Sequence, residues 1–411
     1  MRIALLSYRS KAHCGGQGVY VRHLSAGLAE LGHEVEVLSG PPYPEDLDPR
    51  VRLSQVPSLD LFADPAGVHF PSLRTLRSRA DWIEYLVTLT GCFAEPWAFS
   101  VRAARILRER RDEFDVAHDN QSLGYGLLSV LRQRIPLVVT IHHPITRDVA
   151  LELAAAPSWR RRLSIRQWYR FVGMQARVAR RMPLVLGVAS TSLRDAVDDF
   201  GLDPARTRVV PLGVDTAMFA PGGQRVRGRI VAVASADRPL KGVVHLLEAF
   251  AKVRTAHDVE LCLVSTLDPA GPSARRIAEL GIEDAVRTFS HITDEELAAL
   301  LASAEVMCVP SLYEGFSLPT VEAMACGTPL VATRAGAVPE VVGEDGTCAL
   351  LVEPGDSEAL AGALLRLLES PELRERLGAA GRARAEQRFS WVAVARSTAQ
   401  VYREAIADAH R

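Results

Sequence analysis

The chain has 411 residues, more than one hydrophobic core usually serves, so its length favours two domains of about 200 residues each. Its 48 Lys and Arg residues nearly balance its 49 Asp and Glu residues, and the formal net charge is −1. This balance lacks the global positive charge of nucleic-acid-binding proteins, so we expect no nucleic-acid partner.

The cysteines and the apolar stretches bear on the cellular compartment of the protein. The six cysteines are scattered, without CxxC pairs or zinc-binding spacings, which fits a reducing cytoplasm. The most apolar stretch, residues 82–99, is interrupted by Glu84, Glu95 and Pro96, so it lacks the roughly 20 apolar residues of a membrane-spanning helix. The N-terminus runs directly into a strand-like pattern instead of a cleavable leader. We therefore expect a cytoplasmic protein that does not cross a membrane.

Strand and helix patterns alternate in the first half of the chain. Residues 3–7 read as a buried strand, apolar residues at helical spacing follow over 20–31, and 35–38 read as the next strand. Further strands are predicted at 137–141 and 184–188, each followed by polar or turn residues. This is the pattern of a parallel, Rossmann-like sheet with functional loops at its carboxyl ends.

Proline and glycine cluster at 219–224, and the alternating pattern then starts again. The second set of predicted strands is 230–234, 259–264, 306–309, 330–333 and 348–352. We therefore expect an α/β protein with two doubly wound domains. The first comprises residues 1–215 together with a returning helix at 390–411, and the second comprises 216–389.

The loop at 14–18 is rich in glycine and lies between a predicted strand and a predicted helix. Glycines there allow close backbone approach, and the amides of a helix start attract phosphate. A tight turn without a ligand is the alternative. The loop does not spell GxGxxG, and no acid for a ribose ends the second strand, which argues against NAD.

Two glutamates frame residues 314–322, after the strand predicted at 306–309. Pro319 favours a helix start, which places Glu314 in the loop and Glu322 inside the helix. Backbone amides at a helix start suit sugar hydroxyls or a diphosphate, and carboxylates accept hydrogen bonds from vicinal diols. The alternative is a loop cap and a solvated helix residue.

Residues 314–342 resemble the signature of glycosyltransferase family 4. The similarity extends to Gly15 and Gly16, and to residues 115–118, 211–215 and 289–297. This resemblance implies the GT-B fold, in which two Rossmann-like, doubly wound domains face a central cleft. It also implies transfer with retention of anomeric configuration, no cofactor and no catalytic metal.

The resemblance assigns roles to individual residues. Glu314 is expected to hold donor sugar hydroxyls, Glu322 the ribose, and Lys241 the diphosphate. The full set of expected donor-binding residues is Gly16, Gln17, Arg238, Lys241, Ile292, Glu314, Gly315, Phe316, Ser317, Leu318 and Glu322.

Three histidines are candidates on the side of the first domain. His118 ends the pattern at 115–118, and the resemblance places it at a strand terminus, in contact with the donor sugar near its reacting carbon. We count it with Lys241 and Glu314 as catalytic. His142 and His143 are expected to face the acceptor, or one of them satisfies a buried backbone group.

The sequence departs from the family pattern before Lys241. Family members usually carry an arginine five or six residues before the lysine, whereas this chain has Ser235 and Ala236 there. Arg238 either replaces the missing charge or is a surface arginine.

Residues 159–181 carry eight arginines and no acidic residue. Apolar residues recur at helical spacing from Ile165 to Ala179, so we predict a basic amphipathic helix. Such a helix either lies on an anionic membrane, at the inner face, or packs its apolar stripe into the first domain.

Together these features predict a retaining hexosyltransferase that uses a nucleotide-diphosphate sugar of the UDP-glucose or GDP-mannose type. The acceptor is a small molecule, a glycan or a lipid-linked hydroxyl, and the mechanism is front-face substitution. The alternatives are a GT-B sugar-nucleotide epimerase and a non-catalytic sugar-nucleotide-binding protein.

Overall fold

The computed structural model describes residues 1–10, 16–61, 72–142 and 144–409. The chain divides into two compact units. Unit 1 comprises Met1–Val210 and Val394–Arg411, and unit 2 comprises Pro211–Ala393. The sequence suggested these boundaries a few residues away, after 215 and after 389.

Unit 1 is built on a seven-stranded sheet in the order β3-β2-β1-β4-β5-β6-β7, with every neighbouring pair parallel. The strands are β1 (Arg2–Ser7), β2 (Glu34–Ser39), β3 (Arg52–Gln55), β4 (Val116–Asn120), β5 (Leu137–Ile141), β6 (Leu184–Gly187) and β7 (Thr207–Val209). The central strands β4 and β5 are buried along their whole length, because helices cover both faces of a parallel sheet.

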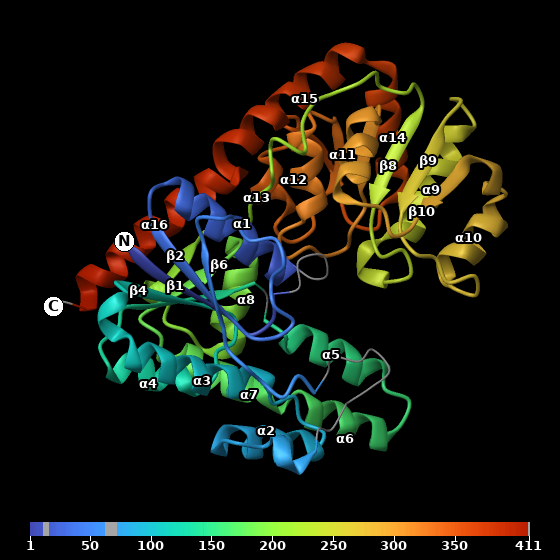
Figure 1. The fold of residues 1–411 in the computed structure, drawn as a ribbon. Coiled ribbons are helices and arrows are strands. Elements are labelled where there is room, and N and C mark those ends of the chain that lie inside the picture. Colours follow the sequence, from blue (N-terminus) through green and yellow to red (C-terminus); the bar gives the residue numbers. More distant parts are fainter. Residues whose placement is uncertain (11–15, 62–71, 143, 410–411) are drawn as a thin grey trace. The chain divides into compact units, whose positions relative to one another are not determined.

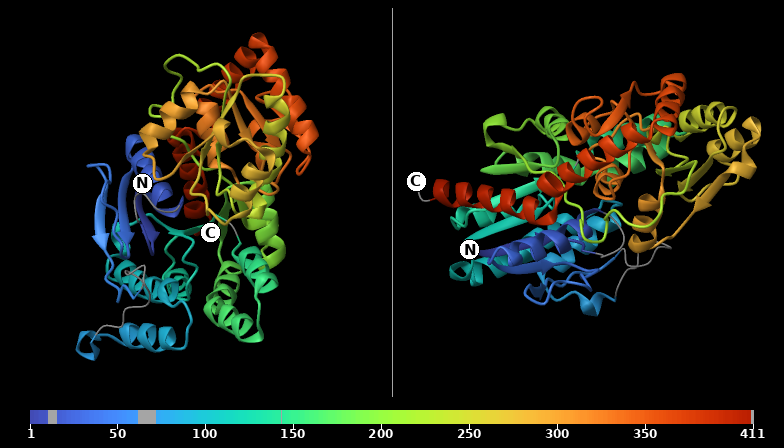
Figure 2. Two further views of the ribbon diagram at one scale, coloured as in Figure 1. Left: turned by 90° about the vertical axis from the view of Figure 1, so that its right-hand side faces the viewer. Right: turned by 90° about the horizontal axis from the view of Figure 1, so that it is seen from above.

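Helices cover the two faces of this sheet (Figure 1). Those of unit 1 are α1 (Gly16–Glu30), α2 (Arg79–Leu89), α3 (Glu95–Glu109), α4 (Gly126–Arg132), α5 (Thr146–Ala155), α6 (Trp159–Trp168), α7 (Arg170–Ala179), α8 (Ser190–Phe200) and the C-terminal α16 (Trp391–Ala409). Apolar residues of α3, α4, α7 and α8 share one core with β4 and β5. Figure 2 shows α16 (red) alongside α1 (blue), on the other face.

Unit 2 repeats the plan with a six-stranded parallel sheet in the order β10-β9-β8-β11-β12-β13. Its strands are β8 (Arg229–Val233), β9 (Glu260–Val264), β10 (Val286–Phe289), β11 (Val306–Val309), β12 (Leu330–Thr333) and β13 (Ala349–Val352). Its helices are α9 (Val243–Arg254), α10 (Pro272–Leu280), α11 (Asp294–Ser303), α12 (Leu318–Ala325), α13 (Val338–Val342), α14 (Ser357–Glu369) and α15 (Pro371–Arg384). The predicted fold class, two Rossmann-like doubly wound domains, is confirmed.

The arginine-rich segment differs from its prediction. It forms two helices, α6 and α7, which meet at Tyr169, instead of one continuous amphipathic helix. The apolar side chains of α7 pack into the core of unit 1, as one alternative predicted. Helix α6, in contrast, leaves two large apolar side chains in solvent: Trp159 and Leu163 are 70% and 59% exposed. Nowhere in the described residues is a helix both long and apolar enough to span a membrane.

Candidate active site

Unit 2 contains a pocket of about 560 Å³ at the carboxyl ends of β8 and β9. Arg238 and Lys241 line it from the loop after β8, and Ser265 and Thr266 line it from the loop after β9. Pro319, in the first turn of α12, contributes a further wall. Ligands of open α/β sheets bind at this edge, so the pocket has the expected position for a phosphate-bearing ligand.

Lys241 and Glu314 form an ion pair in unit 2. Lys241 Nζ lies 2.8 Å from Glu314 Oε1. The hydroxyl of Ser311 donates to the same carboxylate oxygen at 2.6 Å. Glu314 is buried, and Ser311 holds its carboxylate inside unit 2. The side chain of Lys241 is 33% exposed and so remains in contact with solvent. The sequence reasoning missed Ser311, which holds Glu314 in place.

Two glycines allow the backbone on either side of this pair to approach closely. Gly242, which follows Lys241, has φ +63, and a Cβ there would lie 2.0 Å from the carbonyl oxygen of Pro310. Gly336 has φ +54, and its Cβ would lie 2.0 Å from the carbonyl oxygen of Glu314. A side chain at either position would force the backbone that carries Lys241 or Glu314 to move.

The bulky side chain of Phe316 points into unit 2, so it does not cover the backbone of the turn from Gly315 to Leu318. Phe316 is buried and packs edge-on against Phe389 of the same unit, with ring centroids 5.9 Å apart. Ser317 has φ +78 and its hydroxyl pairs with Thr320 at 2.7 Å. A Cβ on Gly315 would meet no atom within 4 Å. The helix α12 begins at Leu318, with Pro319 in its first turn as the sequence predicted.

Glu322 lies four residues further along α12 and is half-buried. Burial raises the pKa of its carboxyl to about 7, and the negative charge of Asp294 adds to the rise. Asp294 begins α11, two residues after Ile292, so the predicted base contact and the predicted ribose contact belong to one region of unit 2. A carboxylate that is costly to ionise gains by accepting hydrogen bonds from a diol.

In unit 1, Gly16 and Gln17 open α1, at the carboxyl end of β1. The carbonyl oxygen of Gln17 accepts a hydrogen bond from Asn120 Nδ2 at 3.3 Å. His143 lies outside the described residues.

His118 corrects an expectation. It lies in the middle of β4, paired with Leu5 and Val138 on the neighbouring strands, and not at a strand terminus. Its side chain is fully buried, with Nδ1 2.7 Å from the Tyr402 hydroxyl and Nε2 2.7 Å from Thr140 Oγ1. Burial lowers the pKa of His118 to about 3, with a further contribution from His142, so the ring is neutral. His118 therefore ties α16 to the sheet, with both ring nitrogens engaged inside unit 1.

His142 follows the last residue of β5 and is only partly buried. Its Nε2 lies 2.7 Å from Asn120 Oδ1, and its backbone amide donates to Gln121 Oε1 at 2.7 Å. The ring of Tyr20 packs against it edge-on, with centroids 4.8 Å apart. At the carboxyl edge of the sheet, His142 replaces His118 as the candidate histidine of unit 1. Asn120 and Gln121 were missed, although they lie only two and three residues after the 115–118 motif.

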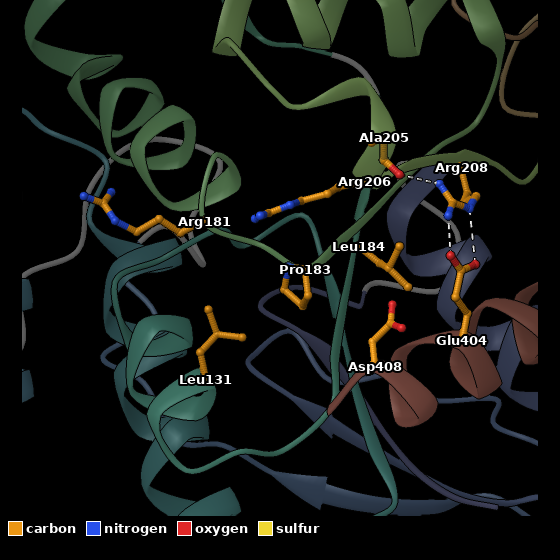
Figure 3. A pocket seen from close by; sticks show the side chains of 9 residues that line it. All are labelled: Leu131, Arg181, Pro183, Leu184, Ala205, Arg206, Arg208, Glu404 and Asp408. Carbon is orange, nitrogen blue, oxygen red and sulfur yellow. Dashed lines mark hydrogen bonds and ion pairs between the residues drawn. The ribbon is translucent and has the colours of Figure 1, made fainter. Parts of the chain in front are cut away.

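Unit 1 contains a hollow of about 360 Å³ at the amino-terminal edge of its sheet, the edge opposite to His142 (Figure 3). Leu184, the first residue of β6, and Arg206, just before β7, line it together with Glu404 of α16. Arg208 donates to Glu404 from Nε at 3.2 Å and from Nη2, which fixes α16 to β7. The hollow is the seam where α16 joins the amino-terminal edge, away from the side that binds ligands in this fold class.

Two Rossmann-like units with parallel sheets, and a pocket lined by Arg238 and Lys241 at the strand ends of the second, are the architecture of a GT-B glycosyltransferase. Two family models match the chain: "Glycosyltransferase Family 4" over residues 14–218, and "Glycosyl transferases group 1" over residues 215–384. The chain belongs to glycosyltransferase family 4 and is an enzyme of that class.

Three relatives illustrate the similarity. The MMP alpha-(1->4)-mannosyltransferase of Mycolicibacterium hassiacum is 61% identical over 407 residues, which cover 99% of each chain. The D-inositol 3-phosphate glycosyltransferase of Kineococcus radiotolerans is 31% identical over 444 residues, covering 99% of this chain and 96% of the relative. The structure of sucrose-phosphate synthase from Thermosynechococcus elongatus superposes with a TM-score of 0.71 at 25% identity, covering 99% of each chain.

Proposed function

We propose that this glycosyltransferase transfers mannose from a GDP-mannose-type donor to a sugar hydroxyl of a glycan, with retention of anomeric configuration. The support for mannose is the 61% identity to a protein named as an alpha-(1->4)-mannosyltransferase. Transfer from an α-linked nucleotide donor into an α-(1→4) bond keeps the configuration at C1, so this product requires retention. The acceptor then offers the 4-hydroxyl of a pyranose.

The single observation that carries the proposal is the pocket of unit 2, which Arg238, Asp237 and Lys241 line, with Lys241 paired to Glu314. A nucleoside diphosphate needs positive charge where its leaving oxygen develops negative charge. Lys241 and Arg238 supply that charge, and the amides at the start of α12 add partial positive charge. Glu314 is assigned to the hydroxyls of the donor sugar and Glu322 to the ribose.

The chemistry needs no enzymic nucleophile. The bond between C1 of the sugar and the β-phosphate oxygen breaks, and the acceptor oxygen forms the new bond to C1 on the same face. The acceptor proton passes to the departing diphosphate. The protein contributes position and electrostatic stabilisation, which this step requires most. We further propose that no metal takes part, because Lys241 and Arg238 provide the neutralising charge.

The test is an assay of the purified protein with GDP-mannose and, separately, UDP-glucose, on an α-mannoside that has a free 4-hydroxyl. We expect GDP release and a product one hexose heavier, with a new α-anomeric signal in proton NMR, and equal rates with and without EDTA. Transfer from UDP-glucose alone would contradict the donor assignment, a β-anomeric signal would contradict retention, and loss with EDTA would contradict the metal-free mechanism.

The other two functions considered from the sequence have less support. An epimerase would convert the sugar nucleotide with no acceptor present, and a binding protein would turn nothing over. The chain belongs to a family of transferases, and a pocket lysine and a paired carboxylate are both present in unit 2.

We extend the proposal to a peripheral contact with an anionic membrane surface through α6. In this helix the exposed Trp159 and Leu163 accompany four exposed arginines, Arg160, Arg161, Arg162 and Arg166. Aromatic and cationic side chains together favour the headgroup region of anionic lipid.

A further inference from the structure

The side chain of Asn120 connects the start of α1 with His142, which are far apart in the sequence of unit 1. It is fully buried at the end of β4. Its Nδ2 donates to the carbonyl oxygen of Gln17 in the first turn of α1, at 3.3 Å, and its Oδ1 lies 2.7 Å from His142 Nε2. One amide thus contacts both the start of α1 and the histidine after β5.

These contacts determine which nitrogen of His142 carries the proton when the ring is neutral. The carbonyl of Gln17 can only accept, so Asn120 must turn its NH₂ toward α1 and its oxygen toward His142. That oxygen also can only accept, so Nε2 of His142 is the donor. The lone pair of the neutral ring is therefore on Nδ1.

The loop after Asn120 is held in a costly conformation that supports the same histidine. Gln121 and Leu123 have φ +56 and +46, which non-glycine residues seldom adopt. The buried Asp119 accepts from the Leu123 amide at 2.9 Å, and Gln175 donates to the Gln121 carbonyl at 3.1 Å. In this conformation Gln121 Oε1 accepts from the His142 amide at 2.7 Å.

We propose that Asn120 is a positioning residue that sets the tautomer and the ring orientation of His142 relative to the start of α1. The inference rests on the proposed function and on the expectation from the sequence that His142 faces the acceptor. Gln17 acts through its backbone, as the anchor that orients the Asn120 amide.

The test uses the full-length protein with Asn120→Ala and Asn120→Asp, assayed for transfer and labelled with ¹⁵N-histidine for NMR. The signal of His142 is identified by its loss in His142→Ala. We expect the wild-type ring to be protonated at Nε2, and Asn120→Ala to lose that preference. We also expect Asn120→Ala to lower kcat at least about tenfold, since misplaced catalytic groups cost rates of this order or more.

The affinity for GDP separates this role from a general structural one. Most of the residues assigned to GDP, among them Lys241 and Glu322, lie in unit 2, and Asn120→Ala removes only a side-chain contact to the Gln17 carbonyl, so the dissociation constant should change less than about threefold. Asn120→Asp keeps an acceptor opposite His142 Nε2 and should retain Nε2 protonation. Ser25→Ala, which removes a buried hydroxyl whose bond to the Arg22 carbonyl is local to α1, should match the wild type in every readout.

Two results would overturn the inference in different ways. If His142→Ala leaves kcat unchanged while wild-type transfer is observed, the expected placement of His142 at the acceptor is wrong, and the inference fails although the proposed function stands. If His142→Ala lowers kcat but Asn120→Ala changes neither the tautomer nor kcat, only the role of Asn120 is wrong.

Discussion

Lys241 Nζ lies 2.8 Å from Glu314 Oε1, so the ammonium assigned to the diphosphate and the carboxylate assigned to the donor sugar neutralise each other in the free protein. Both groups are paired. An unpaired charge would cost considerable free energy at a carboxylate as buried as Glu314. Under the proposed function, donor binding exchanges the partner of each group, since the diphosphate takes the place of Glu314 at Lys241. The pair is thus a ground-state arrangement that the diphosphate competes with.

Lys241→Ala should lower kcat by about a hundredfold or more, because removal of one preorganised electrostatic donor costs about this much. It should also lower stability by roughly 1–3 kcal/mol, because the buried carboxylate of Glu314 then keeps only the Ser311 hydroxyl as a partner and has no counter-charge. Steady-state kinetics and urea unfolding measure the two effects. Lys252→Ala breaks an exposed ion pair with Glu358 in the same unit and is the matched control. Equal kinetic losses in the two variants would contradict the role of Lys241.

Arg238→Ala should raise KM for the donor about tenfold and lower kcat less than Lys241→Ala does, because its exposed guanidinium contributes to binding the diphosphate and, screened by solvent, less to the charge that develops on it. Arg238→Lys retains the charge, so its donor KM should lie between those of the wild type and Arg238→Ala. Arg227→Ala removes an exposed arginine that does not line the pocket, and it should behave as the wild type. If the donor KM of Arg238→Ala equals that of Arg227→Ala, Arg238 is only a surface residue.

Gly242→Ala should destabilise unit 2 and reduce activity together. A left-handed φ of +63 alone costs a non-glycine residue about 1–2 kcal/mol, and the added Cβ would also meet the Pro310 carbonyl at 2.0 Å. Gly362→Ala, inside α14 with nothing near its Cβ, is the matched control and should gain about 0.5–1 kcal/mol. The comparison is made by thermal unfolding, and a neutral Gly242→Ala would show that the loop before α9 tolerates displacement.

Much of the fold was predictable because its strands are short, buried apolar runs. The predicted strands at 137–141, 306–309 and 330–333 coincide with β5, β11 and β12. Three strands were missed for one physical reason. Strands β3, β7 and β10 lie at sheet edges and keep polar, exposed side chains, so they show neither an apolar run nor clean alternation.

The site was predictable in unit 2 and less so in unit 1. Residues 314–322 combine a helix start with two carboxylates, a local signal that sequence reveals. His118 was misplaced by two residues, because β4 continues to Asn120 and buries it. The hydrogen bond between Asn120 and His142 joins the ends of two different strands, so no local pattern predicts it. The break between α6 and α7 at Tyr169 was not predictable either, because no proline or glycine marks it.

Glu322 predicts a pH dependence of stability. Its pKa is raised to about 7 in the folded protein from an ordinary value of 4.5, so the folded state holds a proton that the unfolded state has lost between these values. The free energy of unfolding should therefore fall as pH rises from about 4.5 to 7, and level off above. Glu322→Gln should remove this contribution and be more stable than the wild type at pH 8. The exposed Glu344→Gln is the control and should follow the wild type at each pH.

The same carboxyl predicts a pH dependence of nucleotide binding. Hydrogen bonds from a ribose diol favour the ionised carboxylate, so GDP affinity should increase as pH rises through about 7. Titration calorimetry of wild type and Glu322→Gln at pH 6 and pH 8 tests this. A GDP affinity of the wild type that is flat across this range would argue against the ribose contact.

Helix α6 should bind anionic lipid through its exposed apolar and cationic side chains. Trp159 and Leu163 are 70% and 59% exposed, and each arginine near an anionic surface contributes about 1 kcal/mol. The protein should therefore sediment with vesicles that contain phosphatidylglycerol and remain in solution with pure phosphatidylcholine. Because the attraction is screened, binding should fall steeply as salt rises past the physiological range. The double variant Trp159→Ser and Leu163→Ser should lose binding, whereas Leu86→Ser, at a 53% exposed position on α2, should retain it. Wild-type protein that stays in the supernatant with anionic vesicles at low salt would show that α6 meets no lipid, and would leave the glycan-acceptor proposal standing without it.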